Sequence, residues 1–396
     1  MKILLYRYGS ICEPDILDTF QRMGLEVIEE QAEITNKQLT SADRIQLVEN
    51  ILKAEHPLFV FSINFYPAIS EICHIYNTPY LCWTVDSPVP ELFSESVKRP
   101  TNRIFLFDRA QYECFAPYNP GCIHHLPLAS STERFSRVIT SITDAERKNY
   151  QGDISFVGSL YSEKNPMHSL KNLPDYAKGY IDALVETSLK IYGYNPVEGA
   201  MTPELTQAIK SCAPSFYSPG ATITDPDTYI AAHSYIGMQI AETERIRTLN
   251  LLGQFFPVEL YTRSDTSPLN CTRDGLGVHV HGGVSTLTEM PKIFHLSKIN
   301  LNMTIKPIQT GLPLRIFDIL GCGGFLMTNY QPELTEHFEI GVDVEAYASM
   351  EELVDKCAYY LEHEDVRKQI ALNGYQKVAH NHTYIHRLKK MIETIL

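Results

Sequence analysis

Short apolar runs alternate with longer amphipathic stretches along this chain. In the first third, apolar runs predict buried strands, and helical periodicity of apolar positions fits between them, for example at 41–54 and 67–77. The strands are expected at 3–6, 58–61, 80–83 and 103–107. Strands that alternate with helices indicate an α/β fold with parallel sheets.

A second series of the same kind follows in the rest of the chain. Strands are expected at 153–159, 258–261, 278–281, 299–302 and 325–328, which predicts a second nucleotide-fold sheet. Between the first two of these strands lie about a hundred residues with helical patterns, far more than a crossover needs, so we expect a helical insertion. These patterns lie near 167–192, 203–212 and 227–253, and a capping box at Ser349–Glu352 predicts a helix that runs to about Glu362.

The length of 396 residues exceeds what one hydrophobic core usually serves, so two domains are expected. A polar stretch near 128–150 separates the two series of strands. The predicted domains are an N-terminal Rossmann-like domain at 1–135 and a second at 150–378, with its helical insertion at about 165–253.

The charge and composition narrow the classes of partner and location. A net charge of −13 argues against nucleic acid as a main partner and gives no support for binding to anionic membranes. No stretch approaches the roughly 20 apolar residues that span a bilayer, and the start MKILLYRYGS predicts a strand and turn rather than a signal peptide. Nine cysteines without CxxC spacing indicate reduced thiols. A cytoplasmic location without an integral membrane segment is therefore expected.

The run from Gly311 to Thr328 carries the most specific chemistry. It predicts a loop that opens into a short helix, with Pro313 at the first helical position and with Arg315 and Asp318 on one face. The N–H groups of the helix start and the charge of Arg315 suit a diphosphate, and Asp318 could accept ribose hydroxyls. The alternative is an amphipathic helix packed on a sheet, with Arg315 and Asp318 as a solvated pair.

Four further residues have side chains that could belong to a site. Asp86 follows a buried strand and precedes Ser87-Pro88, so it could bind an acceptor hydroxyl or act as general base, or it could form an Asx turn. Tyr261, at the end of a strand, could face a nucleobase or simply start a loop. His279 and His281 alternate on a strand without a nearby metal-ligand pattern, so structural histidines are favoured and no metal site is expected.

Several segments resemble the CgeB-like glycosyltransferases, which are named for a spore-maturation protein. The C-terminal match is the more specific and comprises 289–304, the run from Gly311 to Thr328, and Asn329-Tyr330-Gln331; 83–88 and 154–161 are also similar. The resemblance implies a GT-B fold, in which two Rossmann-like domains face a cleft. It further implies a sugar nucleotide bound mainly by the second domain, an acceptor bound mainly by the first, no required metal, and a last helix, here 381–396, that returns to the first domain.

The wider group of retaining GT-B enzymes, which carries a basic pair after the first strand of the donor domain and two acidic residues eight apart, suggests roles for individual residues. Lys164 matches the lysine that binds the diphosphate, whereas Ser159 stands where an arginine is common. Asp318 matches the acidic residue that contacts the ribose, and Thr310 stands where a first acidic residue would touch the donor sugar. Arg315 could supply the charge that Ser159 lacks.

The expected function is transfer of a sugar from a nucleotide-diphosphate sugar to an unidentified glycan, protein or small molecule. Lys164, Arg315 and the N–H groups near Gly311 would neutralise the leaving diphosphate, Ser159 and Tyr261 would complete the donor site, and no cofactor beyond the donor is expected. Two alternatives come from other classes: a sugar-nucleotide epimerase and a catalytically silent, glycosyltransferase-like binding partner. A periplasmic-type binding protein is disfavoured by the missing signal sequence.

Overall fold

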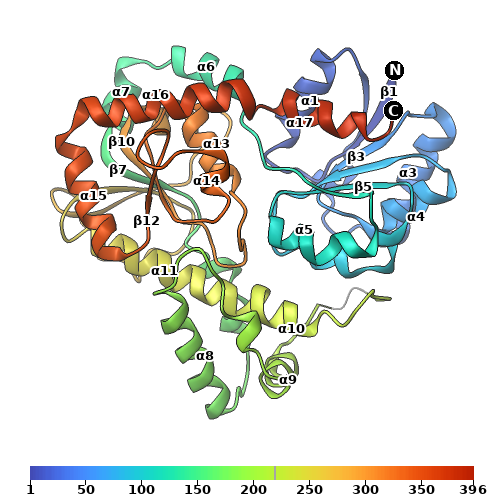
Figure 1. The fold of residues 1–396 in the computed structure, drawn as a ribbon, viewed down its shortest axis with the longest axis horizontal. Helices are drawn as coiled ribbons and strands as arrows, with labels where there is room; N and C mark the ends of the chain where they lie inside the picture. The colour runs from blue at the N-terminus through green and yellow to red at the C-terminus, as the bar shows by residue number, and fades with distance from the viewer. Residues whose placement is uncertain (218–219) are drawn as a thin grey trace. The chain divides into compact units, whose positions relative to one another are not determined.

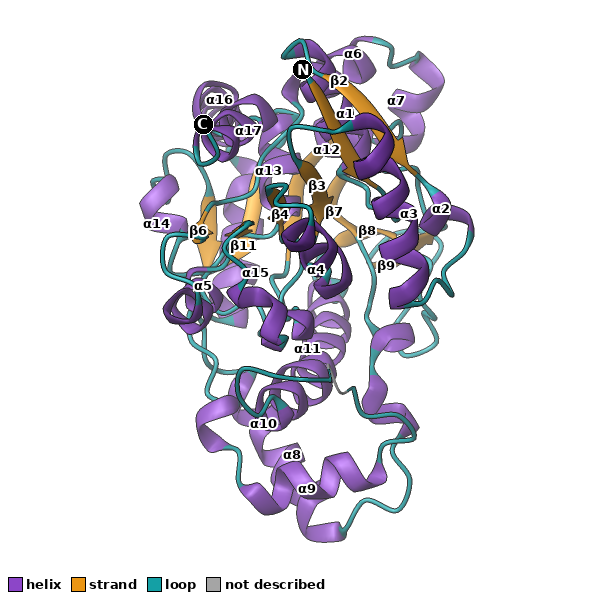
Figure 2. Ribbon diagram, turned by 90° about the vertical axis from the view of Figure 1, so that its right-hand side faces the viewer, coloured by secondary structure: helices purple, strands orange, loops and turns teal. Residues whose placement is uncertain are grey.

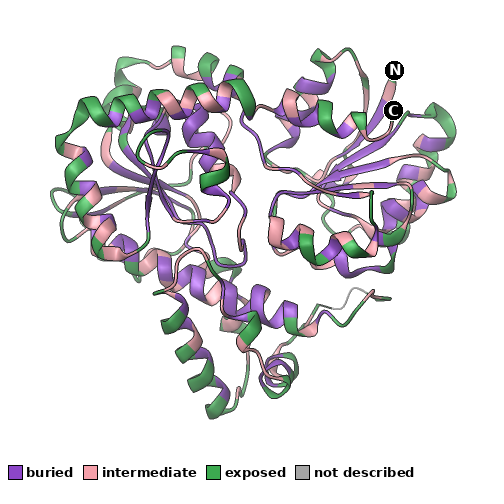
Figure 3. Ribbon diagram, in the orientation of Figure 1, coloured by how far each residue is buried: buried purple, intermediate pink, exposed green. Residues whose placement is uncertain are grey.

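The computed structural model describes residues 1–217 and 220–396, which form two compact units (Figure 1). Unit 1 comprises Met1–Leu128, Tyr217–Pro226 and Thr383–Leu396, and unit 2 comprises Ala129–Phe216 and Asp227–His382. Each unit contains its own six-stranded parallel sheet, and Figure 3 shows the strands of both sheets as mostly buried. The fold is therefore α/β with two parallel sheets, as the sequence predicted.

The sheet of unit 1 has the strand order β2-β1-β3-β4-β5-β6. The predicted strands correspond to β1, β3, β4 and β5, whereas β2 and β6 were missed. β2 has the sequence EVIEE and is only partly buried, and β6 has three residues, because both are edge strands with less apolar surface to cover. The strands are β1 (Lys2–Tyr6), β2 (Glu26–Glu30), β3 (Val60–Ile63), β4 (Tyr80–Trp83), β5 (Asn102–Leu106) and β6 (Ile123–His125).

The α-helices of unit 1 include the last helix of the chain. They are α1 (Glu13–Arg22), α2 (Ala32–Thr35), α3 (Ser41–Glu55), α4 (Pro67–Ile75), α5 (Arg109–Phe115) and α17 (Tyr384–Glu393). The Tyr384 ring of α17 lies 5.9 Å from the Trp83 ring, and Arg387 Nε donates to the carbonyl oxygen of Pro127 at 2.8 Å. The C-terminus is thus packed on the N-terminal sheet.

A short piece of the inserted region also belongs to unit 1. The backbone N–H of Ile223 donates to the carbonyl of Phe93 at 2.8 Å, and that of Glu95 donates to Ala221 at 3.1 Å. Residues 129–135, which the sequence analysis placed with the N-terminal domain, lie instead in unit 2, where the Ser130 side chain meets Gly321. Unit 1 is therefore assembled from three separate segments of the chain.

The sheet of unit 2 has the order β12-β11-β10-β7-β8-β9, and only the three-residue β12 was not predicted. The strands are β7 (Gly152–Val157), β8 (Pro257–Tyr261), β9 (Gly277–His281), β10 (Ser297–Asn302), β11 (Leu326–Asn329) and β12 (Glu345–Tyr347). The core of this sheet includes Ile154, Leu249, Val278, Leu301 and Met327. The α-helices of unit 2 outside its insertion lie before, between and after these strands in the chain. They are α6 (Thr132–Thr140), α7 (Asp144–Tyr150), α12 (Met290–Leu296), α13 (Leu314–Gly321), α14 (Leu334–His337), α15 (Met350–Glu362) and α16 (Glu364–Asn381).

The helical insertion of unit 2 has a small core of its own, with Ala177, Ile181, Leu205 and Ile209 among its buried residues. Its helices are α8 (Asp175–Ser188), α9 (Pro203–Cys212), α10 (Asp227–Tyr229), the π-helical η7 (Ile230–Ile236) and α11 (Gly237–Leu252). Figure 2 shows α8, α9 and α11 together, and α11 leads back into the sheet at β8. Among the described residues, no helix has the combination of length and apolar character that crossing a membrane requires.

Candidate functional site

Helix α13 places Arg315 and Asp318 side by side near its start. Pro313 is the N-cap residue, with φ −68° and ψ 157°, so it precedes the helix rather than occupying the first helical position that the sequence suggested. Arg315 Nη1 lies 3.6 Å from Asp318 Oδ2, and the two side chains are 24% and 8% exposed. The pair is therefore largely buried, and the alternative of a solvated pair is wrong.

The surroundings of the Arg315 guanidinium are mostly apolar. It lies 5.2 Å from the centre of the Phe294 ring and contacts the sulfur of Met290. Burial lowers the pKa of Arg315, and the Asp318 carboxylate opposes that shift. A cation in such surroundings interacts strongly with any anion that reaches it, because little solvent screens the charge.

The loop after β7 carries Ser159 and Lys164. Ser159 Oγ donates to Glu163 Oε1 at 2.6 Å and accepts from the backbone N–H of Tyr161 at 2.7 Å. Ser264 Oγ donates to the other oxygen of Glu163 at 2.8 Å, which fixes the loop against the strand end of β8. Ser159 therefore shapes the loop, whereas Lys164 is exposed, with its Nζ 5.4 Å from the Tyr161 ring centre.

Arg245, in α11 of the insertion, lies under this loop and was not singled out from the sequence. Its guanidinium lies 4.5 Å from the Tyr161 ring centre and 5.2 Å from that of Phe156. Nη1 donates to the carbonyl of Ser159 at 2.5 Å, and Nη2 donates to that of Met303 at 2.8 Å. Nε is buried without a hydrogen-bond partner among the described residues, and none of their carboxylates lies within ion-pair distance of Arg245.

Arg245 and Arg315 belong to one electrostatic neighbourhood. Burial lowers the pKa of Arg245, and the charge of Arg315 lowers it further. Glu244, the adjacent acid on α11, is itself buried, which raises its pKa and disfavours its charged form. Arg315 is paired with Asp318, whereas Arg245 has no ion-pair partner among the described residues, so the ends of β7 and β10 carry a net positive charge that favours an anionic ligand.

A sequence signal for Arg245 exists in retrospect. It falls at the i+4 position from Ala241 and the i−4 position from Leu249, both of which are fully buried. An arginine on the apolar stripe of a helix has to find a partner or a ligand, since burying an uncompensated charge is costly. The sequence pattern does not show which residues pack against this face of α11, so it did not identify Arg245 as a site residue.

The loop that leads into α13 is held by a carboxylate from further along the chain. Thr310 Oγ1 donates to Glu333 Oε1 at 2.8 Å, and the backbone N–H of Glu333 donates back to the carbonyl of Thr310 at 3.2 Å. Glu333 is only 1% exposed, and Gly311 next to Thr310 is also buried. An acidic group therefore lies beside Thr310, although it comes from the N-cap of α14 rather than from position 310 itself.

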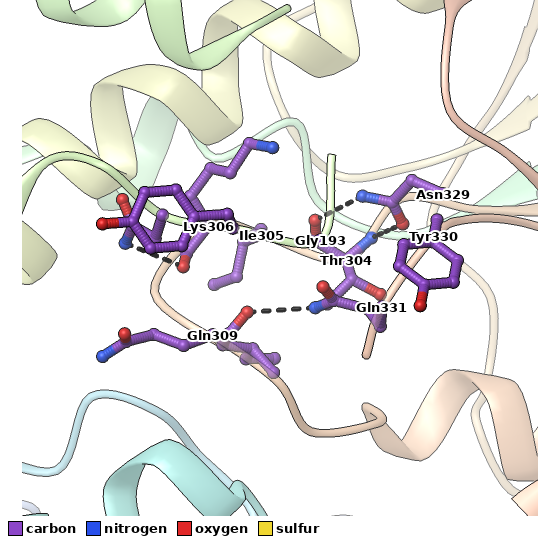
Figure 4. Close-up of a pocket in the computed structure, with 11 residues that line it drawn as sticks. Gly193, Thr304, Ile305, Lys306, Gln309, Asn329, Tyr330 and Gln331 are labelled. Atoms are coloured by element: carbon purple, nitrogen blue, oxygen red, sulfur yellow. Dashed lines mark hydrogen bonds between the residues drawn. The ribbon is translucent and has the colours of Figure 1, made fainter. Parts of the chain in front are cut away.

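A small polar pocket adjoins the same loop (Figure 4). Asn329 exchanges two 2.8 Å hydrogen bonds with the backbone of Thr304, and Gln331 Nε2 donates to the carbonyl of Ile308 at 3.0 Å. The cavity measures about 10 Å³, room for about one water molecule. These amides therefore hold the 304–311 loop in place, and the pocket is too small for a sugar.

Tyr261 does not face an open site. Its ring is 3% exposed, stacks on His281 with centres 4.6 Å apart, and has a raised pKa because of burial. His281 and His279 both bond to Glu259, at 2.6 and 3.0 Å, which lowers the pKa of that carboxyl. Both histidines thus have a structural partner. In the part of the chain that the structure describes, no group of three or more potential ligands is arranged to hold a metal ion.

Asp86 lies in unit 1, beyond the carboxyl end of β4, and is exposed. Its Oδ2 accepts from Asn64 Nδ2 at 2.7 Å. The Asx turn considered from the sequence is wrong, because the residue two positions on is Pro88, which has no N–H to donate.

Comparisons with known proteins agree with this architecture. Residues 239–393 match a family model described as glycosyl transferase-like. No curated protein matches the sequence significantly. Solved structures of low sequence identity share the fold over nearly the whole chain.

Anabaena Alr3699/HepE in complex with UDP-glucose has a TM-score of 0.54 at 12% identity, covering 100% of this chain and 99% of that one. Sucrose-phosphate synthase from Thermosynechococcus elongatus has a TM-score of 0.55 at 9% identity, covering 99% and 98%. A glycosyltransferase from Rickettsia africae has a TM-score of 0.52 at 11% identity, covering 100% and 97%. The fold is the GT-B-like architecture of these solved structures, and residues 239–393 are similar to glycosyl transferase-like proteins.

Proposed function

We propose that this protein transfers a sugar from a nucleotide-diphosphate sugar to an acceptor hydroxyl, with the donor bound by unit 2. The observation that carries the proposal is the pair Arg245 and Arg315, two partly desolvated cations near the start of α13. A diphosphate supplies the negative charge that Arg245 lacks, and the positive end of the helix dipole at the start of α13 adds to its binding.

Each of the neighbouring residues has a role in this proposal. Arg315, Arg245 and the exposed Lys164 neutralise the charge that grows on the leaving diphosphate in the transition state. Asp318 accepts the ribose hydroxyls, and the backbone around Gly311 contacts the phosphates. Ser159 has an indirect role, because it holds the loop that carries Lys164. Tyr261 packs against the sheet and does not contact the nucleobase. Because side-chain cations serve the diphosphate, the reaction needs no metal.

Two carboxylates are proposed for the sugars. Glu333, which lies beside Thr310, bonds a hydroxyl of the donor sugar, where the resemblance to retaining GT-B enzymes leads us to expect an acid. Asp86 of unit 1 binds the acceptor hydroxyl and acts as general base, and unit 1 is accordingly the acceptor unit. Uridine diphosphate sugars are the first donors to test, because one structural neighbour was solved with UDP-glucose.

The deciding experiment is incubation of the full chain with a panel of nucleotide sugars, with and without acceptors, while released nucleoside diphosphate and sugar products are measured. A glycosyltransferase releases nucleoside diphosphate and forms a glycoside when an acceptor is present. Conversion of the donor to an isomer without release would instead establish an epimerase. Donor binding by calorimetry without any turnover in the whole panel would establish a binding protein.

A further inference from the structure

The helical insertion of unit 2 contacts the loop that leads from β10 into α13. Residues 303–311 of this loop, here called the donor loop, join the sheet to the helix that carries the buried arginine and aspartate pair. Three residues of the insertion reach it: Asn195 between α8 and α9, Gly237 at the start of α11, and Arg245 about two turns further on. The insertion therefore belongs to the surroundings of the candidate donor site.

Two of these contacts are hydrogen bonds to carbonyl groups of the donor loop. Asn195 Nδ2 donates to the carbonyl of Lys306 at 3.0 Å, and Arg245 Nη2 donates to that of Met303 at 2.8 Å. The Asn195 amide is itself fixed, because its Oδ1 accepts from the backbone N–H of Val197 at 3.1 Å. Leaving a buried carbonyl without its donor is costly, so these bonds hold the loop to the insertion.

Lys306 strengthens this attachment from the side of the donor loop. Its ammonium group donates to the carbonyl of Ile191, and Nζ lies 5.1 Å from the centre of the Tyr192 ring. Burial lowers the pKa of Lys306, and the Glu244 carboxylate opposes that shift. Since Ile191 and Tyr192 follow α8, a second inserted segment besides α11 holds the loop.

Gly237 makes a very close contact between the insertion and the donor loop. A Cβ atom on Gly237 would lie 2.6 Å from Pro307 Cγ and 3.2 Å from Pro307 Cδ, and the first of these is well inside van der Waals contact. The backbone angles of Gly237, φ −59° and ψ −38°, are those of an ordinary α-helix, which any residue adopts. Glycine weakens a helix relative to alanine, so the requirement for glycine comes from the distance to Pro307.

The π-helical turn of η7 leads directly into this contact. The backbone N–H of Gly237 donates to the carbonyl of Ala232, five residues earlier, and α11 begins at Gly237. A turn of this kind is rare in helices and occurs frequently at functional sites. Because it holds more residues than an α-helical turn, it fixes which face of α11 meets the donor loop.

The donor loop is also held by residues outside the insertion. Asn329, Gln331 and Glu333, at the end of β11 and after it, each form hydrogen bonds with the loop. The loop is thus attached to two separate parts of unit 2. In a close-packed interior, an extra atom at Gly237 cannot be absorbed by the loop alone, so the displacement passes to α11 and to Arg245.

We propose that the insertion positions the donor site and that Gly237 sets the separation of α11 and the donor loop, an inference that rests on the proposed glycosyltransferase function. At this separation Arg245 bonds to the carbonyls of both Ser159 and Met303. A nucleoside diphosphate then meets a preformed arrangement, which lowers the cost of binding. Gly237 is a positioning residue, since it acts through Arg245 and the loop.

Substitutions at Gly237 and Pro307 test the contact, with calorimetry of whichever of UDP, GDP and ADP the parent binds most tightly. Gly237→Ala should weaken binding by about tenfold or more, because it overpacks the contact. Pro307→Ala removes the Cγ and Cδ atoms that the new Cβ would meet, so the double variant should bind within about threefold of the parent. Gly179→Ala in α8, whose Cβ would meet nothing within 4 Å, is the matched control and should bind as the parent does.

The outcomes separate positioning from stability. A purely structural glycine would lower the unfolding temperature and leave nucleotide affinity unchanged, so parent-like affinity in Gly237→Ala would overturn the proposal. A loss of affinity that Pro307→Ala does not restore would overturn it as well. If Gly237→Ala does not fold, Asn195→Ala decides: loss of the bond to Lys306 should weaken binding severalfold, and unchanged affinity would contradict the proposal. A parent chain that binds none of the three nucleotides would instead count against the proposed function.

Discussion

The Arg245 guanidinium lies 4.5 Å from the centre of the Tyr161 ring, although the two residues come from the inserted helix α11 and from the loop after β7. The contact brings a cation from the insertion under the loop that carries Ser159 and Lys164. Because no described carboxylate pairs with Arg245, the contact leaves a charge that a ligand can satisfy.

Replacement of Arg245 tests the donor site most directly. Arg245→Met should weaken UDP binding by about tenfold or more, since a charged hydrogen bond to phosphate is worth about 1.5–3 kcal/mol. The unliganded protein should lose little thermal stability, because removing a partly buried, unpaired charge offsets the loss of its two bonds to carbonyls. Calorimetry with UDP and thermal unfolding with and without UDP provide the two measurements.

Arg247→Met is the matched control for that experiment. Arg247 lies two residues further along α11, is exposed and pairs with Glu186, so its loss should leave UDP affinity unchanged. If Arg245→Met binds UDP as the parent does and only unfolds at a lower temperature, Arg245 is a structural residue.

Asp318 and Arg315 should differ in the step that they affect. Asp318→Asn keeps the shape but weakens a charge-assisted hydrogen bond to the ribose, which should cost about 1–3 kcal/mol in donor binding. Arg315→Ala should lower kcat more than it raises KM, because charge grows on the diphosphate in the transition state. Steady-state kinetics and UDP titrations distinguish the two effects. Equal UDP affinity in both variants, with loss of thermal stability alone, would make the pair a feature of the helix.

Chelation tests whether side-chain cations suffice. Release of nucleoside diphosphate should survive excess EDTA, because Arg245, Arg315 and Lys164 stand where a divalent cation would otherwise act. Activity is measured before and after chelation, and again with added Mg²⁺ or Mn²⁺. Complete loss that either ion restores would show a metal-dependent reaction.

Glu146 should contribute to stability in acid. Its bond to Lys292 lowers the pKa of the Glu146 carboxyl to about 2, from an ordinary value of 4.5. The folded state therefore binds fewer protons than the unfolded state in this window, so the stabilisation is complete above about pH 4.5 and is lost as the pH falls towards about 2. Urea unfolding of the parent and of Glu146→Gln should differ at pH 6 and converge near pH 2. A constant difference across this range would contradict the assignment.

Much of the architecture followed from local pattern. The apolar runs at 80–83 and 299–302 predict strands because side chains of a central parallel strand are buried on both faces whatever lies beyond them. Likewise, the glycine pair at 323–324 and the apolar spacing before it predict α13 to within about two residues, apart from the placement of Pro313. Edge strands such as β2 carry a weaker signal, because half-exposed strands tolerate polar residues.

Tertiary structure alone decided which distant groups share a site. The sequence predicts roles for Arg315 and Lys164 on local grounds. Arg245 reaches the Ser159 loop only because α11 packs beside the residues that follow β7 and β10. Tertiary packing also decides two other hydrogen-bonded contacts. Thr310 pairs with Glu333. Glu13 accepts hydrogen bonds from the backbone N–H groups of Tyr8 and Gly9. The periodicity of apolar positions predicts which side of a helix or strand is buried. The partner of a buried charge depends on how different helices and strands pack together, which the periodicity does not show.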